Sequence, residues 1–274
     1  MNAIAIGPFV FSNDRFVAIL TVLTFFIVAE IVARRRPDYR AVIHNWTAGA
    51  LVIWIITARL GFVIANWEGF APAPLTVLAI WQGGFNATAG AVGLGATVLA
   101  AFFTRPKIIG PLAISILGGA LAFGVATYFL PDQAKGRIPV AIFTDMSGVP
   151  VNLAARDGQP LVLNLWATWC PPCRREMPMM VDLAQSQAGV DIIFANQGEP
   201  ERNIERYLDL TGLTAAGMVR DPTRALMQEF GLLGLPSTLF FTADGTLQSV
   251  HTGEISRAAL LAAINDLKRD SGAE

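Results

Sequence analysis

Residues Trp166–Pro178 read WATWCPPCRREMP and begin where the mostly apolar stretch PLVLNLW at Pro160–Trp166 ends. The apolar stretch predicts a buried strand, and Pro171 supplies the backbone φ that is favoured at the first position of a helix. Cys170 therefore caps the predicted helix. Cys170 and Cys173 are the only two cysteines among 274 residues. A disulfide across two intervening residues closes too short a loop to stabilise a fold by much, so the spacing favours a redox-active pair.

The helix N-terminus predicts different roles for the two cysteines. The positive end of the helix dipole can lower the pKa of a capping thiol from about 8.5 toward neutrality, so Cys170 is the expected nucleophile. Cys173 lies one turn on and is placed to attack the resulting mixed disulfide. The two intervening prolines remove two amide donors, which favours reduction over strong oxidation. Glu176 is either the base for Cys173 or a first-turn acid that complements the dipole.

Other uses of a CxxC pair receive little support. Such a pair is also half of some zinc sites, but the chain has no second pair, and its only histidines are His44 and His251. We therefore expect no metal, and no cofactor besides the redox-active disulfide. The formal net charge of -1 is uninformative about nucleic acid, and we find no nucleic-acid-binding motif.

The run WCPPCRREMP resembles the active site of membrane-tethered thiol-disulfide reductases of the TlpA and ResA type, which have a thioredoxin fold. The similarity extends over the C-terminal half. It implies that Glu176 is the active-site glutamate and that Asn164 stands where thioredoxin keeps a buried aspartate. It also implies that Pro178 kinks the active-site helix, and NQGE at Asn196–Glu199 matches the NxGE segment of the family. The expected catalytic residues are thus Cys170, Cys173 and Glu176.

A second motif, GLPST at Gly234–Thr238, precedes an apolar run. The resemblance implies that Pro236 is a cis-proline that faces the disulfide. A cis-proline there would turn the backbone of Leu235 toward an extended substrate peptide, which would pair with it as an added strand. We therefore expect Trp169, Leu235 and Pro236 to bind substrate.

The rest of the C-terminal half alternates strand and helix patterns, which predicts a thioredoxin-like α/β domain over residues 132–274. The predicted strands are two short ones within Ile138–Leu153, then Val190–Asn196, Leu239–Thr242 and Thr246–His251. The predicted helices are Pro200–Thr211, Pro222–Phe230 and Ser256–Arg269, the last capped by Ser256.

The N-terminal half is apolar enough to lie in a membrane. The chain is 53% hydrophobic and 15% charged, and the apolar excess lies before Pro131. These residues predict a transmembrane domain of four spans over residues 1–131. No small-residue cleavage site follows the first span, so we do not expect a removable signal peptide. The predicted spans are Phe16–Ala33, Ala41–Ala65, Leu75–Phe103 and Ile108–Leu130.

The basic residues predict the orientation of these spans. They lie between the first two spans and between the last two, whereas the loop 67–74 has one acid and no base. Basic loops favour the cytoplasm. Both termini and the redox domain are then expected in the periplasm, next to a bacterial inner membrane. The basic residues of these two loops are Arg34, Arg35, Arg36, Arg40, Arg105 and Lys107.

Polar residues within the spans raise two alternatives. Arg59 and His44 either form a polar site for a lipid head group or quinone, or pair with another helix, with Glu30 as a possible partner. ARLGFV and the later WQGGFNATAG resemble motifs of prolipoprotein diacylglyceryl transferase. Thr88 stands where that enzyme has a histidine. The resemblance thus implies a truncated, transferase-derived module without acyl transfer, with membrane lipids as partners.

The sequence therefore predicts a membrane-anchored periplasmic thiol-disulfide oxidoreductase that reduces protein disulfides. The family resemblance suggests cytochrome c maturation or general thiol repair as its context. Three alternatives remain open: a disulfide oxidase or isomerase, a lipid-modifying transferase with an appended redox domain, and a scaffold switched by its disulfide. No cysteine precedes Cys170, so the membrane half cannot relay thiols. The resemblance suggests a DsbD- or CcdA-type transporter as electron donor.

Overall fold

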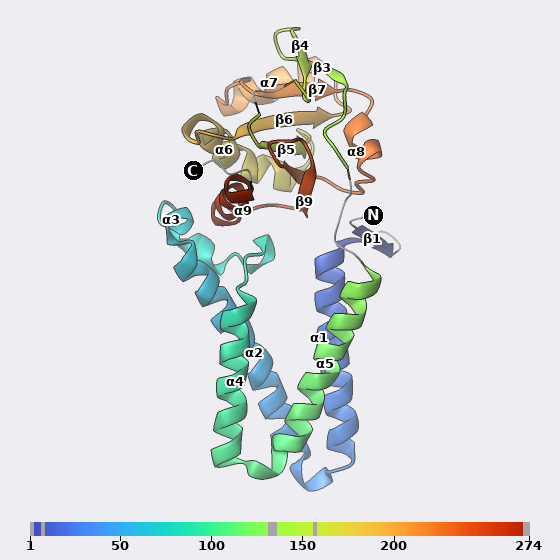
Figure 1. Ribbon diagram of the computed structural model, residues 1–274, viewed down its shortest axis with the longest axis vertical. Coiled ribbons are helices and arrows are strands. Elements are labelled where there is room, and N and C mark those ends of the chain that lie inside the picture. Colours follow the sequence, from blue (N-terminus) through green and yellow to red (C-terminus); the bar gives the residue numbers. More distant parts are fainter. Residues whose placement is uncertain (1–2, 7–8, 131–135, 156–157, 271–274) are drawn as a thin grey trace. The chain divides into compact units, whose positions relative to one another are not determined.

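The protein is built from two units of different kinds. The structure, a computed structural model, describes residues 3–6, 9–130, 136–155 and 158–270. One unit is Asn13–Pro131 and the other combines Met1–Ser12 with Asp132–Glu274. The first unit is helical and the second contains the sheets (Figure 1). At the N-terminus, β1 (Ala3–Ile6) and β2 (Phe9–Ser12) form an antiparallel pair, which the sequence analysis did not predict.

Four helices of the first unit are long and apolar enough to cross a membrane, within the described part of the chain. Short helices connect them: η1 (Pro37–Tyr39), α3 (Trp67–Phe70), η2 (Pro74–Leu78), η3 (Ile80–Gln82) and η4 (Pro106–Ile108). The long helices agree with three predicted spans to within a few residues. They are α1 (Asn13–Arg34), α2 (Arg40–Ala65), α4 (Ala87–Thr104) and α5 (Ile109–Phe129).

The third predicted span begins too early. A helix was expected from Leu75, but α4 begins at Ala87. Gly83 and Gly84 have φ values of 78° and 82°, which belong to the left-handed region and interrupt a helix. Asn86 then caps α4, because its side chain accepts a hydrogen bond from Ala89 N. Apolar composition alone could not distinguish these turns from a helix.

The long helices pack through small residues. Gly61 of α2 meets α4 so closely that an added Cβ would lie 2.3 Å from Ala89 Cβ. Such contacts let membrane helices approach each other. Near the loops that carry the basic residues, side chains from all four helices form a common buried cluster: Ala33, Ile43, Ala50, Ala101, Ile108 and Leu112.

The second unit is a thioredoxin-like α/β domain, as predicted. Its seven-stranded sheet has the order β4-β3-β7-β6-β5-β8-β9. The central β5 is buried throughout, parallel to β6 and antiparallel to β8. The strands are β3 (Ile142–Asp145), β4 (Pro150–Asn152), β5 (Leu161–Trp166), β6 (Asp191–Gln197), β7 (Met218–Asp221), β8 (Ser237–Phe241) and β9 (Leu247–Thr252).

Side chains alternate along β5 and so divide the core into two halves. Leu161, Leu163 and Leu165 face one cluster, which includes Phe230. Val162 and Trp166 face the other cluster, to which three helices contribute. Asn164 therefore belongs to the second face. These helices are α6 (Pro171–Ser186), α7 (Glu201–Thr211) and α9 (Arg257–Asp270), and the short α8 (Ala225–Glu229) lies on the first face.

The predicted elements of this unit need small corrections. The first strand begins at Ile142 instead of Ile138, and α8 is shorter than the predicted helix. β7 was not predicted, because only four residues form it. The predicted cap of α9 is confirmed, since Ser256 Oγ accepts a hydrogen bond from Ala259 N at 3.2 Å.

Candidate active site

The cysteine pair lies where β5 gives way to α6. Cys170 is the N-cap residue of α6, as predicted, and forms a disulfide with Cys173. The Cys170 sulfur accepts a hydrogen bond from Cys173 N at 3.3 Å. Both cysteines are buried in this oxidised state, whereas the neighbouring Trp169 is 60% exposed. That Trp169 binds substrate remains a prediction.

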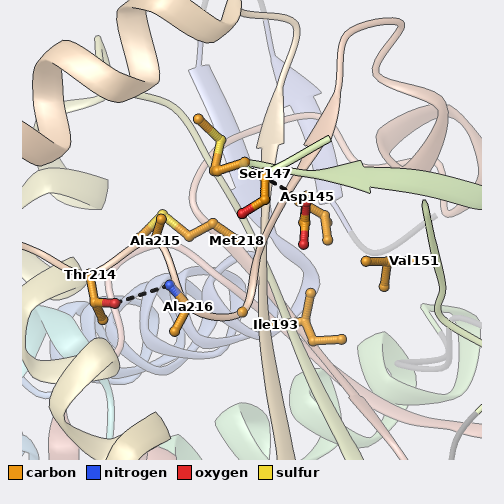
Figure 2. Close-up of a pocket in the computed structure, with 11 residues that line it drawn as sticks. Asp145, Ser147, Val151, Ile193, Thr214, Ala215, Ala216 and Met218 are labelled. Carbon is orange, nitrogen blue, oxygen red and sulfur yellow. Dashed lines mark hydrogen bonds between the residues drawn. The ribbon is translucent and has the colours of Figure 1, made fainter. Parts of the chain in front are cut away.

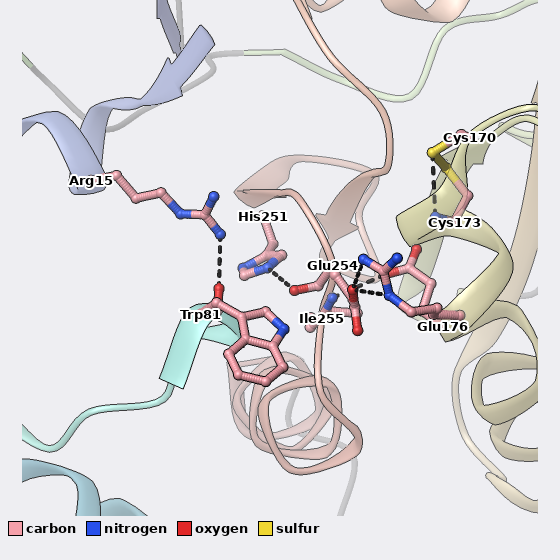
Figure 3. A network of polar contacts seen from close by, with 9 residues as sticks. Arg15, Trp81, Cys170, Cys173, Glu176, His251, Glu254 and Ile255 are labelled. Carbon is pink, nitrogen blue, oxygen red and sulfur yellow. Dashed lines mark hydrogen bonds and ion pairs between the residues drawn. A yellow bond between two sulfur atoms is a disulfide. The ribbon is translucent and has the colours of Figure 1, made fainter. Parts of the chain in front are cut away.

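Glu176 lies on the same helix and is only 2% exposed (Figure 3). Its Oε1 accepts a hydrogen bond from Asn164 Nδ2 at 3.0 Å, and its Oε2 accepts one from Ile255 N at 2.9 Å. Burial raises the pKa of Glu176 to about 8, although both hydrogen bonds favour the charged form and oppose the rise. At neutral pH the carboxyl group is therefore mostly protonated, and a catalytic role for Glu176 remains a prediction.

Asn164 can serve both protonation states of Glu176. Its Nδ2 donates to Glu176 and, at 3.1 Å, to Thr238 Oγ1, which is its cross-strand partner on β8. Its buried Oδ1 has no hydrogen-bond partner among the described residues. A half-turn of the amide would point Oδ1 at a protonated Glu176 and at the Thr238 hydroxyl, which could both donate to it. The amide thus fits either a carboxylate or a carboxylic acid.

Strand pairing brings the second motif beside the cysteines. Leu165 of β5 pairs with Ser237 of β8, so the residues just before β8 lie next to the end of β5. The Leu235–Pro236 peptide bond is cis, as predicted. Pro236 is buried and Leu235 is half-buried. That Leu235 and Pro236 bind substrate remains a prediction.

Glu199 supports the loop before Cys170. One carboxylate oxygen accepts hydrogen bonds from Thr168 N at 2.7 Å and from Asn196 Nδ2 at 2.8 Å. The other accepts a bond from the Thr168 hydroxyl at 2.6 Å. Glu199 therefore ties the segment after β6 to the segment after β5. The NQGE motif alone does not indicate this role, because Thr168 lies 31 residues from Glu199 along the chain.

Comparisons with known proteins agree with this geometry. Residues 135–250 match the AhpC/TSA family. The thiol-disulfide oxidoreductase ResA of Halalkalibacterium halodurans is 32% identical over 146 residues, which cover 51% of this chain and 82% of that protein. The chain belongs to the ResA family. It is therefore a thiol-disulfide oxidoreductase.

Other relatives cover the same region. ResA of Geobacillus thermodenitrificans is 27% identical over 59% of this chain and 95% of its own length. The crystal structure of a thiol:disulfide interchange protein from Chlorobium tepidum TLS covers 50% of this chain and 98% of its own, with 24% identity and a TM-score of 0.44.

Within the ResA-family domain, an ion pair lies beside Glu176. Arg175 donates twice to Glu254 Oε2, at 2.6 and 2.8 Å (Figure 3). The pair joins α6 to the segment that supplies Ile255 N, and His251 Nε2 lies 3.3 Å from Glu254 O. The charges of Glu254 and Arg175 act on the pKa of Glu176 in opposite directions and less strongly than burial does.

A cavity of about 270 Å³ elsewhere in this domain is not part of the site (Figure 2). Its lining includes Asp145–Ser147 and Thr214–Val219, where β7 begins, and Ile193 near the start of β6. The cysteines instead follow the end of β5, which is parallel to β6. The cavity and the disulfide therefore lie at opposite ends of these strands.

The polar residues of the helical unit form two separate groups. Glu30 contacts His44 Nε2 at 2.8 Å, as predicted, and also pairs with Arg34 and Arg40. The suggested pairing of Glu30 with Arg59 is wrong. Glu30 lies near the end of α1 and Arg59 near the far end of α2, because the two helices run in opposite directions. Arg59 bonds backbone carbonyls instead.

Proposed function

We propose that this protein reduces disulfides of proteins in the bacterial periplasm through Cys170 and Cys173. The observation that carries the proposal is the disulfide at the N-cap of α6, with the buried Glu176 on the same helix. A structural disulfide would need neither a helix N-terminus at one sulfur nor a buried carboxyl group nearby.

In the proposed reaction, the Cys170 thiolate attacks a substrate disulfide, forms a mixed disulfide and releases one substrate thiolate, which takes a proton. Cys173 then loses its proton to the ionised fraction of Glu176 and attacks the Cys170 sulfur. The mixed disulfide breaks, the second substrate thiolate takes a proton, and Cys170 and Cys173 are left as the observed disulfide. The substrate gains two electrons and two protons. Proton transfer is easy because a carboxyl pKa of about 8 is close to that of a thiol.

The hydrogen bonds at the nucleophile support the proposed direction of the reaction. The Cys170 sulfur accepts a bond from Cys173 N, while Pro171 and Pro172 have no N–H to offer. Weak stabilisation of the thiolate makes the reduced form a better electron donor. This supports a reductase over an oxidase.

Substrate binding is assigned to the exposed Trp169 and to the backbone around Leu235 and Pro236. Leu235 precedes β8 beside the end of β5, so an extended peptide that crosses the disulfide would run along it. Backbone pairing of this kind is largely independent of sequence and would suit many client proteins.

The proposed setting is the bacterial inner membrane, with the ResA-family domain and both termini in the periplasm. The four apolar helices and the basic residues between them support this orientation. We assign cytochrome c maturation as the context and a DsbD- or CcdA-type transporter as the electron donor, both by family resemblance. We also propose that the helical unit derives from a lipid transferase without acyl transfer, since Arg59 of ARLG contacts Gly83 and Gly84 of WQGG.

Trapping of clients tests the assignment of the two cysteines. We expect Cys173→Ser to accumulate mixed disulfides with periplasmic proteins, because the resolving attack is missing. Cys170→Ser should trap none. Non-reducing gels of cell extracts distinguish the two, and the reverse pattern would reverse the roles. A reduction potential near the -120 mV typical of strong oxidants, instead of roughly -270 mV, would contradict the proposed direction.

A further inference from the structure

Arg59 of α2 is a buried arginine whose observed hydrogen bonds all go to backbone carbonyls. It is 5% exposed. Its Nε donates to Val77 O at 2.9 Å, its Nη1 to Gly83 O and Gly84 O at 2.6 and 2.9 Å, and its Nη2 to Thr76 O at 3.1 Å. The rings of Phe70 and Phe85 flank the guanidinium at 5.3 and 5.9 Å. One side chain therefore satisfies four carbonyls of the segment between α2 and α4.

The segment between α2 and α4, residues 66–86, folds back along the side of α2. Asn86 N donates to Ala58 O at 2.9 Å, so α4 begins level with Ala58. Ala58 precedes the last residue of α2, Ala65, by seven residues, which corresponds to about 10 Å along a helix. Residues 66–86 thus cover the last two turns of α2, which belong to its membrane-crossing stretch.

Irregular backbone at this depth would normally be costly. A carbonyl without a hydrogen-bond donor costs several kcal/mol in hydrocarbon, so irregular segments in membranes need internal partners. Arg59 supplies such partners to Thr76, Val77, Gly83 and Gly84. Arg15 supplies a hydrogen-bond donor to a fifth carbonyl, because its Nη2 donates to Trp81 O at 3.0 Å (Figure 3).

Several large apolar side chains of the same segment are exposed. Leu75 is 83% exposed, Leu78 is 73% exposed and Trp81 is 63% exposed. Glu68 is the only charged residue in 66–86. Tryptophan is enriched where membrane hydrocarbon meets water, and Trp67 is also exposed. An apolar exterior over internally bonded carbonyls suits contact with lipid and not with water.

We propose that residues 74–84 lie in the periplasmic leaflet of the bilayer, where their exposed apolar side chains contact phospholipid acyl chains and Arg59 and Arg15 satisfy five of their carbonyls. This inference rests on the proposed membrane setting. It assigns Arg59 a role in positioning this segment and makes the segment a lipid-facing surface.

Spin labelling tests the location. A label is attached to Leu78→Cys in a Cys170→Ser, Cys173→Ser background, and the full chain is placed in bilayers of phosphatidylethanolamine and phosphatidylglycerol. We expect relaxation of the label by oxygen, which concentrates in hydrocarbon, and little relaxation by a water-soluble nickel chelate. Leu121→Cys in the middle of α5 is the lipid control, and Leu210→Cys on α7 is the water control.

The controls separate the possible failures. Nickel access at position 78 with the lipid control still protected would overturn the inference alone. Nickel access at position 121 would overturn the membrane setting as well. An immobilised label at position 78 that neither reagent reaches would also overturn the inference, because it would indicate a protein partner or a second copy.

The role of Arg59 is tested in the same labelled protein. We expect Arg59→Leu to expose position 78 to the nickel chelate, because the carbonyls of the segment must then find water. Arg105→Leu, the same change in an exposed connection, should leave the label protected. If the label at position 78 stays protected from the nickel chelate in Arg59→Leu, Arg59 does not have this role. If this variant does not fold, the location of position 78 still rests on the measurement with Arg59 intact.

Discussion

At the scale of single residues, Glu176 and its partners decide the chemistry. The carboxyl group is buried, and both observed partners, Asn164 Nδ2 and Ile255 N, are donors. Donors favour the charged form, yet burial outweighs them and keeps the pKa at about 8. The group therefore remains close to the point at which it can either accept or release a proton near neutral pH.

Glu176 should make stability depend on pH. A carboxyl whose pKa rises from 4.5 to about 8 on folding binds more protons in the folded state between these values. The free energy of unfolding therefore falls as pH rises through this window, by up to about 1.4 kcal/mol per pH unit. We expect Glu176→Gln to flatten this slope in the oxidised protein, as measured by unfolding at several pH values. Glu205→Gln, an exposed glutamate on α7, is the control, and an equal effect there would contradict the assignment.

Asn164 should set the pH at which the protein works. Its hydrogen bond lowers the pKa of Glu176, so Asn164→Leu should raise that pKa further. Loss of a bond to a charged group is worth roughly 1.5 to 3 kcal/mol, which moves the pH profile of disulfide reduction upward by about one unit or more. Thr238→Val is the matched control, because it removes a partner of Asn164 but leaves the bond to Glu176. Identical profiles in the two variants would argue against this role.

At the scale of elements, the active site depends on two connections that meet beside the disulfide. The segment after β5 carries Thr168 and Cys170, and the segment after β6 carries Glu199. β5 and β6 are parallel neighbours, so both segments leave the same edge of the sheet. Glu199 joins them by accepting two hydrogen bonds from Thr168, and it accepts a third from Asn196 Nδ2 of β6. The start of α6 is thus held by its own cap and by the neighbouring connection.

Loss of Glu199 should loosen this edge of the sheet. Glu199→Ala leaves Thr168 N, Thr168 Oγ1 and Asn196 Nδ2 without their acceptor, which should lower the free energy of unfolding by about 2 to 4 kcal/mol. Glu201→Ala removes a carboxylate that pairs with Arg220 at 2.6 Å in a partly exposed position, where less than about 1 kcal/mol is expected. Denaturant unfolding measures both. Equal losses would show that Glu199 contributes no more than a surface pair.

At the scale of the whole molecule, the two units have different roles: one carries the redox-active cysteines and the other carries the apolar helices. Both cysteines lie in the ResA-family domain, and none precedes Cys170 in the chain. The helical unit therefore cannot pass electrons by thiol exchange, which makes an outside donor necessary for repeated reduction. In the proposed setting the helical unit holds the domain at the membrane, where such a donor would operate.

The redox state in cells tests this division. Deletion of a DsbD- or CcdA-type transporter should leave Cys170 and Cys173 oxidised, because nothing else recharges the pair. Alkylation of thiols in intact cells, followed by gel electrophoresis, measures the reduced fraction. A pair that stays reduced without the transporter would contradict the thiol route and would indicate a different electron donor.

The sequence by itself determined the features that depend on neighbouring residues. It predicted the cap at Cys170, the buried strand at Pro160–Trp166, four apolar helices and a thioredoxin-like domain, because capping and periodicity are local properties. Family resemblance added the cis bond before Pro236. The sequence also offered Glu30 as a possible partner of His44, and this contact is confirmed.

Only the tertiary structure decided which distant groups meet. Ile255 N reaches Glu176 from 79 residues away, and Thr238 reaches Asn164 from 74 residues away. Arg59 meets Gly83 and Gly84 because the segment between α2 and α4 folds back along α2. A hydrophobic pattern predicts that a residue is buried, but it does not predict which residues it contacts. Those contacts depend on strand order and on the path of each connection.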